Sequence, residues 1–71
     1  MDIFDYLRKA VNRLVGVPEE EIRPESTPKE LNLDLFDMQE LVLDAEKEFD
    51  VILPESEFDT LEGLAKRIQA A

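Results

Sequence analysis

The side chains that could carry chemistry in this chain are almost all carboxylates. The sequence contains no cysteine and no histidine, so it offers no thiolate nucleophile, no imidazole base and no soft metal ligand. Ten acidic residues lie between Asp34 and Asp59, against the single base Lys47. So many carboxylates could bind calcium, act as general acid and base, attract a basic partner, or only keep a small protein soluble.

Two of these uses fit the sequence poorly. A calcium-binding loop needs alternating oxygen ligands around a central glycine and a terminal glutamate, and that pattern is absent. Acid-base catalysis by paired carboxylates needs a dry pocket that shifts one pKa, and a chain of 71 residues has little room for one. We therefore expect no metal site and no enzyme activity. Attraction of a partner and simple solubility both stay open at this point.

The elements that must position these acids are predicted to be helices of one all-α domain spanning residues 1–71. Apolar residues recur at helical spacing from about Asp2 to Val15, and Gly16 then supplies a stop. Charged residues interrupt this first helix, so it predicts neither a signal peptide nor a membrane span. They are Asp2, Asp5, Arg8 and Lys9. A cytoplasmic protein is the default expectation.

The rest of the chain predicts a long loop and three further helices. Three prolines in residues 17–33 exclude a regular element of useful length there. Asp34 is a good N-cap for a second helix, a brief helix is expected at residues 54–58, and Thr60 can cap a last helix. Apolar side chains are expected to pin the loop to the core. They are Val17, Ile22, Leu31 and Leu33.

The second helix has two contrasting faces on a helical wheel. The residues predicted to face the core are Met38, Leu41, Val42, Ala45 and Phe49. The opposite face carries Phe36, Glu40, Leu43 and Lys47, with Asp37 and Asp44 on its flank. Phe36 and Leu43 lie a heptad apart, so they could form one exposed apolar strip among acids. Such a strip favours a docking surface over chance.

Several stretches of the sequence resemble acyl carrier proteins. They are the run LNLDLFD at residues 31–37, ELV at 40–42, EFD at 48–50 and LP at 53–54. The flanking first helix, long loop and closing helix also have counterparts in that family. The resemblance implies a four-helix bundle with a short third helix and a long loop between helices one and two. This fold agrees with the one predicted from periodicity.

The resemblance fails at the residue that matters most for carrier chemistry. Carrier proteins have an Asp-Ser-Leu motif at the start of the second helix, and the serine hydroxyl receives phosphopantetheine from coenzyme A. Here Leu35 occupies the serine position, between Asp34 and Phe36. A hydrocarbon side chain has no oxygen that can form the phosphodiester. Phosphopantetheine is therefore the cofactor expected for the family, but it cannot be attached at Leu35.

The remaining hydroxyls do not replace the missing serine. Ser26 lies in the long loop, Ser56 lies between two glutamates, and Thr60 is expected to cap the last helix. None of them follows the aspartate that opens the second helix. We expect no cofactor on this chain.

These observations predict an interaction module that resembles an acyl carrier protein but carries no acyl group. The net charge of −10 argues against nucleic acid and anionic membranes as partners and favours a protein with a basic patch, for which a biosynthetic enzyme is one candidate. The domain itself is expected to be a monomer. The predicted contact residues are Asp34, Phe36, Asp37, Glu40, Leu43, Asp44 and Lys47. The alternative is an altered or degenerate copy of a genuine acyl or peptidyl carrier protein of fatty-acid, polyketide or related biosynthesis.

Overall fold

The first helix begins and ends where its capping residues predict. The computed structural model describes residues 2–71, and α1 spans Ile3–Val15. The Asp2 carboxylate accepts a hydrogen bond from the Asp5 amide at 3.0 Å, which satisfies one free donor of the first turn. At the other end Gly16 has a φ of 78°, and its amide donates to the Asn12 carbonyl at 2.8 Å. A left-handed residue of this kind closes a helix at little cost when it is glycine.

The connection over residues 17–33 is irregular, as predicted, apart from the short 3-10 helix η1 at Glu19–Glu21. Ile22, Leu31 and Leu33 are buried in the core, and Val17 is half-buried against it. The four side chains expected to pin the loop are therefore all in contact with the core. Pinning by buried apolar side chains explains how a loop of this length stays ordered in a small domain.

The second helix, α2, spans Leu35–Phe49 and starts with a reciprocal capping box. The Asp34 carboxylate accepts from the Asp37 amide at 2.8 Å, and the Asp37 carboxylate accepts from the Asp34 amide at 3.1 Å. The helix ends at Asp50, whose φ of 54° is left-handed and whose amide donates to the Glu46 carbonyl. The predicted start of this helix is confirmed.

The last helix, α3, spans Leu61–Ala70, and two of its first amides donate hydrogen bonds to the long loop. The Leu61 amide donates to the Ser26 carbonyl at 3.1 Å, and the Glu62 amide donates to the Pro24 carbonyl at 2.8 Å. The Thr60 hydroxyl accepts from the Gly63 amide at 3.0 Å, as predicted for a cap. The loop thus satisfies donors that a helix start otherwise leaves without partners.

The brief helix predicted at residues 54–58 is wrong, and with it the four-helix bundle. Within residues 2–71 the α-helices are α1, α2 and α3, and the segment between α2 and α3 is irregular. The Arg67 guanidinium reaches this segment from α3 and donates to the carbonyls of Glu55 at 2.6 Å and Glu57 at 2.8 Å. These carbonyls bond to a side chain of another element, so they do not build a helical turn.

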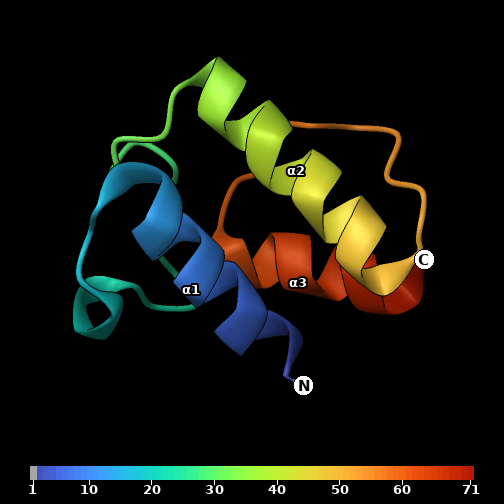
Figure 1. The fold of residues 1–71 in the computed structure, drawn as a ribbon, viewed down its shortest axis with the longest axis horizontal. Coiled ribbons are helices and arrows are strands. Elements are labelled where there is room, and N and C mark those ends of the chain that lie inside the picture. Colours follow the sequence, from blue (N-terminus) through green and yellow to red (C-terminus); the bar gives the residue numbers. More distant parts are fainter. Residues whose placement is uncertain (1) are drawn as a thin grey trace.

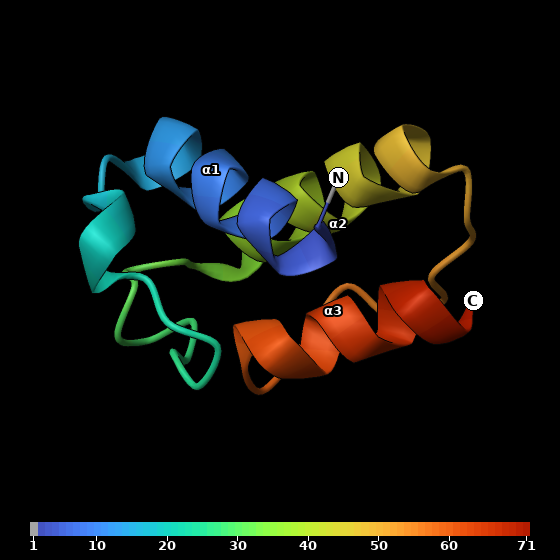
Figure 2. The same ribbon diagram turned by 90° about the horizontal axis from the view of Figure 1, so that it is seen from below.

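The three helices enclose one core. In Figure 1, α1 and α2 lie side by side and run in opposite directions, and Figure 2 shows α3 beneath them. The most deeply buried large side chains come from all three helices. They are Leu7, Val11, Leu41, Leu61 and Leu64. The all-α class predicted from the sequence is confirmed, and this core fixes which side of α2 remains free.

A candidate docking face on α2

The wheel predicted for α2 agrees with the burial of its side chains. Leu41, Val42 and Ala45 are buried, and the predicted core residues Met38 and Phe49 pack against the core while half-buried. On the opposite face Phe36 is 76% exposed and Leu43 is 53% exposed. The two apolar side chains expected at the surface are therefore at the surface. A free face with two large apolar residues is available for contact with another molecule.

Leu35 belongs to this exposed set, although the wheel gave no reason to include it. Its side chain is 46% exposed at the first position of α2, directly before Phe36. A fourth large apolar residue, Ile52, is 85% exposed but lies beyond the end of α2. The predicted strip is thus extended at the start of the helix by one more hydrophobic side chain.

The acids predicted to act in docking fall into two groups. Asp34 and Asp37 lie at the start of α2, where the capping box holds both carboxylates in place. Glu40 and Asp44 lie farther along the helix and line a groove between α1 and α2, together with Lys47. The structure therefore places the predicted residues along one helix, but it divides them between a projecting end and the edge of a groove.

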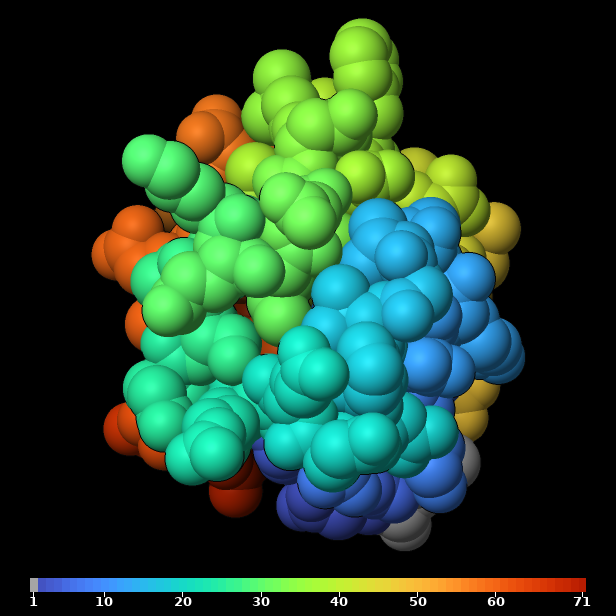
Figure 3. Space-filling view, turned by 90° about the vertical axis from the view of Figure 1, so that its left-hand side faces the viewer, coloured from blue at the N-terminus to red at the C-terminus, as the bar shows by residue number. Residues whose placement is uncertain are grey.

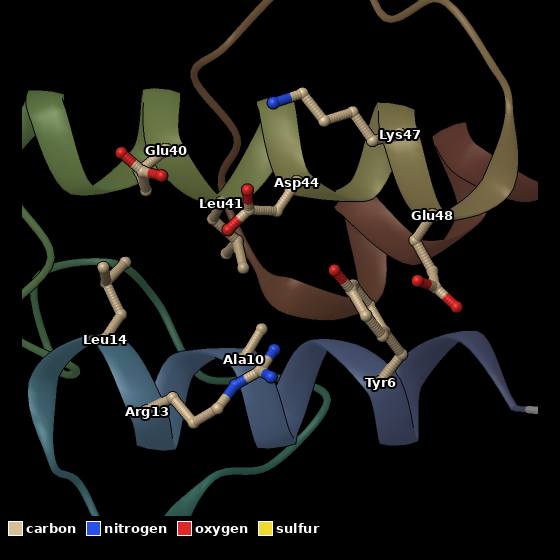
Figure 4. A pocket seen from close by; sticks show the side chains of 9 residues that line it. All are labelled: Tyr6, Ala10, Arg13, Leu14, Glu40, Leu41, Asp44, Lys47 and Glu48. Carbon is tan, nitrogen blue, oxygen red and sulfur yellow. The ribbon is translucent and has the colours of Figure 1, made fainter.

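Figure 4 shows this groove from close by, with α1 on one side and α2 on the other. Its volume is about 500 Å³. Four of the nine lining residues belong to α1, and none of these four was among the predicted contact residues. The lining residues are Tyr6, Ala10, Arg13 and Leu14 on α1, and Glu40, Leu41, Asp44, Lys47 and Glu48 on α2. Residues at positions 6, 10 and 13 share a helical face, which is the signal that could have found them.

The electrostatics of the groove act most clearly on Tyr6. Burial raises the pKa of the Tyr6 phenol above its ordinary value of 10.0, and the nearby Asp44 and Glu48 carboxylates raise it further. The ring is fixed by an edge-to-face contact with Phe49, with 5.2 Å between the ring centres and an interplanar angle of 84°. The phenol therefore keeps its proton to a higher pH than a free tyrosine, and the ring has a defined orientation between the two helices.

The start of α2 does not fit a covalently attached phosphopantetheine. The first four residues of the helix are Leu35, Phe36, Asp37 and Met38, and none has a hydroxyl. Of the chain's other hydroxyls, Ser26 is buried, with its oxygen accepting from the Arg23 amide at 3.0 Å.

The two threonines are also engaged in local structure. The Thr27 hydroxyl accepts from the Glu30 amide at 3.2 Å, and the Thr60 hydroxyl caps α3. Ser56 is half-buried in the segment between α2 and α3. The hydroxyls of the chain thus lie outside the first turn of α2.

Two further observations concern other kinds of site. Among residues 2–71, no group of three or more acidic side chains is placed so that it could hold a metal ion. No helix in the described part of the chain is long and apolar enough to cross a membrane.

Comparison with known proteins gives the family. No solved structure matches the chain significantly. A family model described as phosphopantetheine attachment site matches residues 5–68, which include α1, α2 and most of α3. This match agrees with the resemblance to acyl carrier proteins seen in the sequence, and the chain therefore belongs to the phosphopantetheine attachment site family.

Proposed function

We propose that this domain is a carrier-like module that docks on a basic surface of a protein partner through α2 and holds no phosphopantetheine at the usual position. The observation that carries the proposal is the first turn of α2. There the side chains of Leu35 and Phe36 are exposed beside two carboxylates, and no hydroxyl is present. Such a helix end can make contacts, but it cannot form the phosphodiester bond of a carrier.

The state of the α2 acids supports docking. None of the ion pairs within residues 2–71 involves a residue of α2. Asp34 and Glu40 are exposed, and Asp37 and Asp44 are half-buried. These four carboxylates thus form no ion pair within the described residues. A partner surface with lysine and arginine side chains would be attracted to them and oriented before contact.

The apolar residues supply the other half of the proposed interface. Acids at an exposed rim mainly raise the rate of encounter, whereas buried aromatic side chains slow dissociation. Phe36 and Leu43 are exposed on the face that carries Glu40 and Lys47. The face therefore combines an apolar strip with a charged border, as protein interfaces commonly do.

Attachment can be tested by incubating the protein with coenzyme A and a phosphopantetheinyl transferase of broad specificity. We expect the intact mass of the wild-type chain to stay unchanged, because position 35 offers no nucleophile. The Leu35→Ser variant is expected to gain the mass of one phosphopantetheine. A mass increase of the wild-type protein would contradict the proposed loss of attachment.

The same assay tests docking, because the transferase must bind the domain before it can modify it. In the Leu35→Ser background, Glu40→Lys and Asp44→Lys should each slow modification at low enzyme concentration. The matched control is Glu25→Lys, a charge reversal on an exposed residue of the long loop. Equal modification rates for all three charge reversals would contradict docking through α2.

A further inference from the structure

The groove between α1 and α2 carries charges of both signs on its two walls. On the α2 wall, Glu40, Asp44 and Glu48 are spaced four residues apart and therefore share one face of the helix. The base of the α1 wall is Arg13. Figure 4 shows Asp44 and Arg13 on the two sides of the gap, whereas Lys47 extends away from α1. The groove is therefore bordered by three acids and one base.

These facing charges do not pair with one another. None of the four side chains, nor Lys47, is in an ion pair within residues 2–71. By contrast, Arg8 of the same helix as Arg13 pairs with Asp5. The acids of α2 and the base of α1 thus stay apart across the groove. One molecule that carries both charges can bridge them, with its cation toward α2 and its anion toward Arg13.

The floor of the groove between these charges is apolar. Ala10 and Leu41 are buried there, and Leu14 is half-buried. The Tyr6 ring points into the same gap from α1 (Figure 4). A ligand that crosses this floor is favoured if methylene groups separate its two charges, because they cover apolar surface.

The Tyr6 phenol lies within reach of both kinds of charge. Burial raises its pKa, the Asp44 and Glu48 carboxylates raise it further, and Arg13 lowers it. The acids of α2 and the base of α1 therefore lie near the same point of the groove. A small ligand can contact both.

We propose that this groove binds a free ω-amino acid, a small zwitterion whose ammonium and carboxylate groups are separated by methylene groups. The ammonium donates to the carboxylates of Asp44 and Glu48, and the carboxylate accepts from the Arg13 guanidinium. The methylene chain lies over Ala10 and Leu41. The groove volume of about 500 Å³ falls within the range of ligand pockets, about 300–1,000 Å³.

The walls of the groove favour a free small molecule over a peptide. Both walls are α-helices, whose backbone amides and carbonyls bond within the helix. A peptide group in the groove would therefore find no backbone partner, whereas the charged ends of a zwitterion find side chains.

The site is also separate from the start of α2. Figure 3 shows the first part of α2 standing out at the top of the molecule. The α2 residues that line the groove begin only at Glu40. Binding in the groove therefore does not depend on a protein partner at the helix start.

The wild-type protein can be tested with four small probes. In a titration of the isotope-labelled protein followed by NMR, 6-aminohexanoate should cause saturable shifts at positions 6, 10, 13 and 14 and within residues 40–48. A salt concentration of about 0.1 M screens the general attraction of cations to the acidic domain. Hexylammonium, hexanoate and glycine, which lack the anion, the cation and the methylene spacer respectively, should each bind more weakly. Equal affinity for any of these three would overturn the proposal.

Charge-neutral variants test the two walls separately. Arg13→Gln and Asp44→Asn should each weaken 6-aminohexanoate binding about tenfold, the loss expected for one charge-assisted hydrogen bond. Arg13→Gln should not weaken hexylammonium binding, because that probe has no carboxylate. The matched controls are Arg23→Gln and Glu25→Gln, exposed loop positions outside the groove, which should keep the wild-type affinity. Unchanged 6-aminohexanoate binding in Arg13→Gln, or equal losses in the controls, would rule out the bridged site.

A last probe distinguishes the free ligand from a peptide end. Nα-acetyl-lysine presents an ammonium and a carboxylate across a similar chain but adds a peptide-like amide. We expect it to bind no more tightly than 6-aminohexanoate. Tighter binding would overturn the proposal in favour of the C-terminal lysine of a peptide. None of these titrations uses the transferase, so their outcome is independent of whether docking through α2 fails.

Discussion

At the residue scale, the pKa of Tyr6 measures the electrostatics of the groove between α1 and α2. Tyr6 is the chain's single tyrosine, so the ultraviolet absorbance of its phenolate measures one pKa without overlap. Burial, followed by the Asp44 and Glu48 carboxylates, raises the pKa of Tyr6. We expect the absorbance titration of the native protein to have its midpoint above the ordinary value of 10.0. Double replacement of Asp44 and Glu48 by the corresponding amides should lower that midpoint.

The raised pKa of Tyr6 also links stability to pH. The folded state holds the phenol proton more tightly than the unfolded state, so the stabilisation is complete below the ordinary pKa of 10.0 and is lost as pH rises through the higher folded pKa. We expect the free energy of unfolding in urea to fall across that alkaline window. The fall should be smaller in Tyr6→Phe, which has no phenol. Parallel decreases in both proteins would show that other groups, such as the lysines, cause the loss.

At the element scale, the two leucines of α2 test whether its faces are assigned correctly. Leu41 is 1% exposed and Leu43 is 53% exposed, and both lie in the middle of the same helix. Leu41→Ala removes buried methyl groups and leaves a cavity, so we expect it to lower the free energy of unfolding by about 2–5 kcal/mol. Leu43→Ala should cost less than about 1 kcal/mol. Urea unfolding followed by circular dichroism measures both, and equal losses would contradict the assignment.

The starts of α1, α2 and α3 could be predicted because local residues set them. Asp2, Asp34 and Thr60 each cap a helix through a bond to an amide three residues later. The brief helix at residues 54–58 could not be judged in this way. Its proline and apolar spacing are compatible with a helical turn, but Arg67 of α3 holds its carbonyls. That contact depends on how α3 packs, which sequence periodicity does not reveal.

The candidate site shows the same division between local and tertiary information. Phe36 and Leu43 could be placed on a free face because the periodicity of an α-helix shows which of its residues share a face. Tyr6 and Arg13 were missed because their place beside Asp44 depends on α1 packing next to α2. The sequence identifies Leu35 only as the residue in the serine position. Its exposure next to Phe36 becomes clear once the helix start is seen to project from the surface.

The hold of Arg67 on the segment between α2 and α3 can be tested directly. Arg67→Met keeps much of the side-chain volume but removes the donors to the carbonyls of Glu55 and Glu57. We expect faster amide hydrogen exchange in residues 51–58 and a loss of about 1–2 kcal/mol in unfolding free energy. Lys66→Met is the control, because Lys66 makes only an exposed ion pair with Glu62. If both variants exchange alike, Arg67 does not hold the segment.

At the scale of the whole molecule, the net charge of −10 has two opposite effects. It destabilises the folded domain by repulsion among its acids, and it attracts a basic partner. The longest dimension of the domain is 27 Å. The Debye length is about 30 Å at 0.01 M salt and about 10 Å at 0.1 M. In the more dilute salt every acid therefore repels every other acid across the domain, whereas in the more concentrated salt only neighbours do. The same screening weakens the attraction that brings a basic partner to α2.

We therefore expect salt to stabilise the domain while it slows docking. Between about 0.01 and 0.1 M sodium chloride, the melting temperature should rise by roughly 4–8 °C, the shift that about 1 kcal/mol gives for a domain of this size. Over the same range, modification of the Leu35→Ser variant by the transferase should slow, because fewer encounters are steered toward α2. Glu40→Lys should reduce this salt dependence, whereas Glu25→Lys, away from α2, should retain it. Calorimetry and the mass assay measure the two effects. A transferase rate that does not change with salt would leave the acids with solubility as their only role.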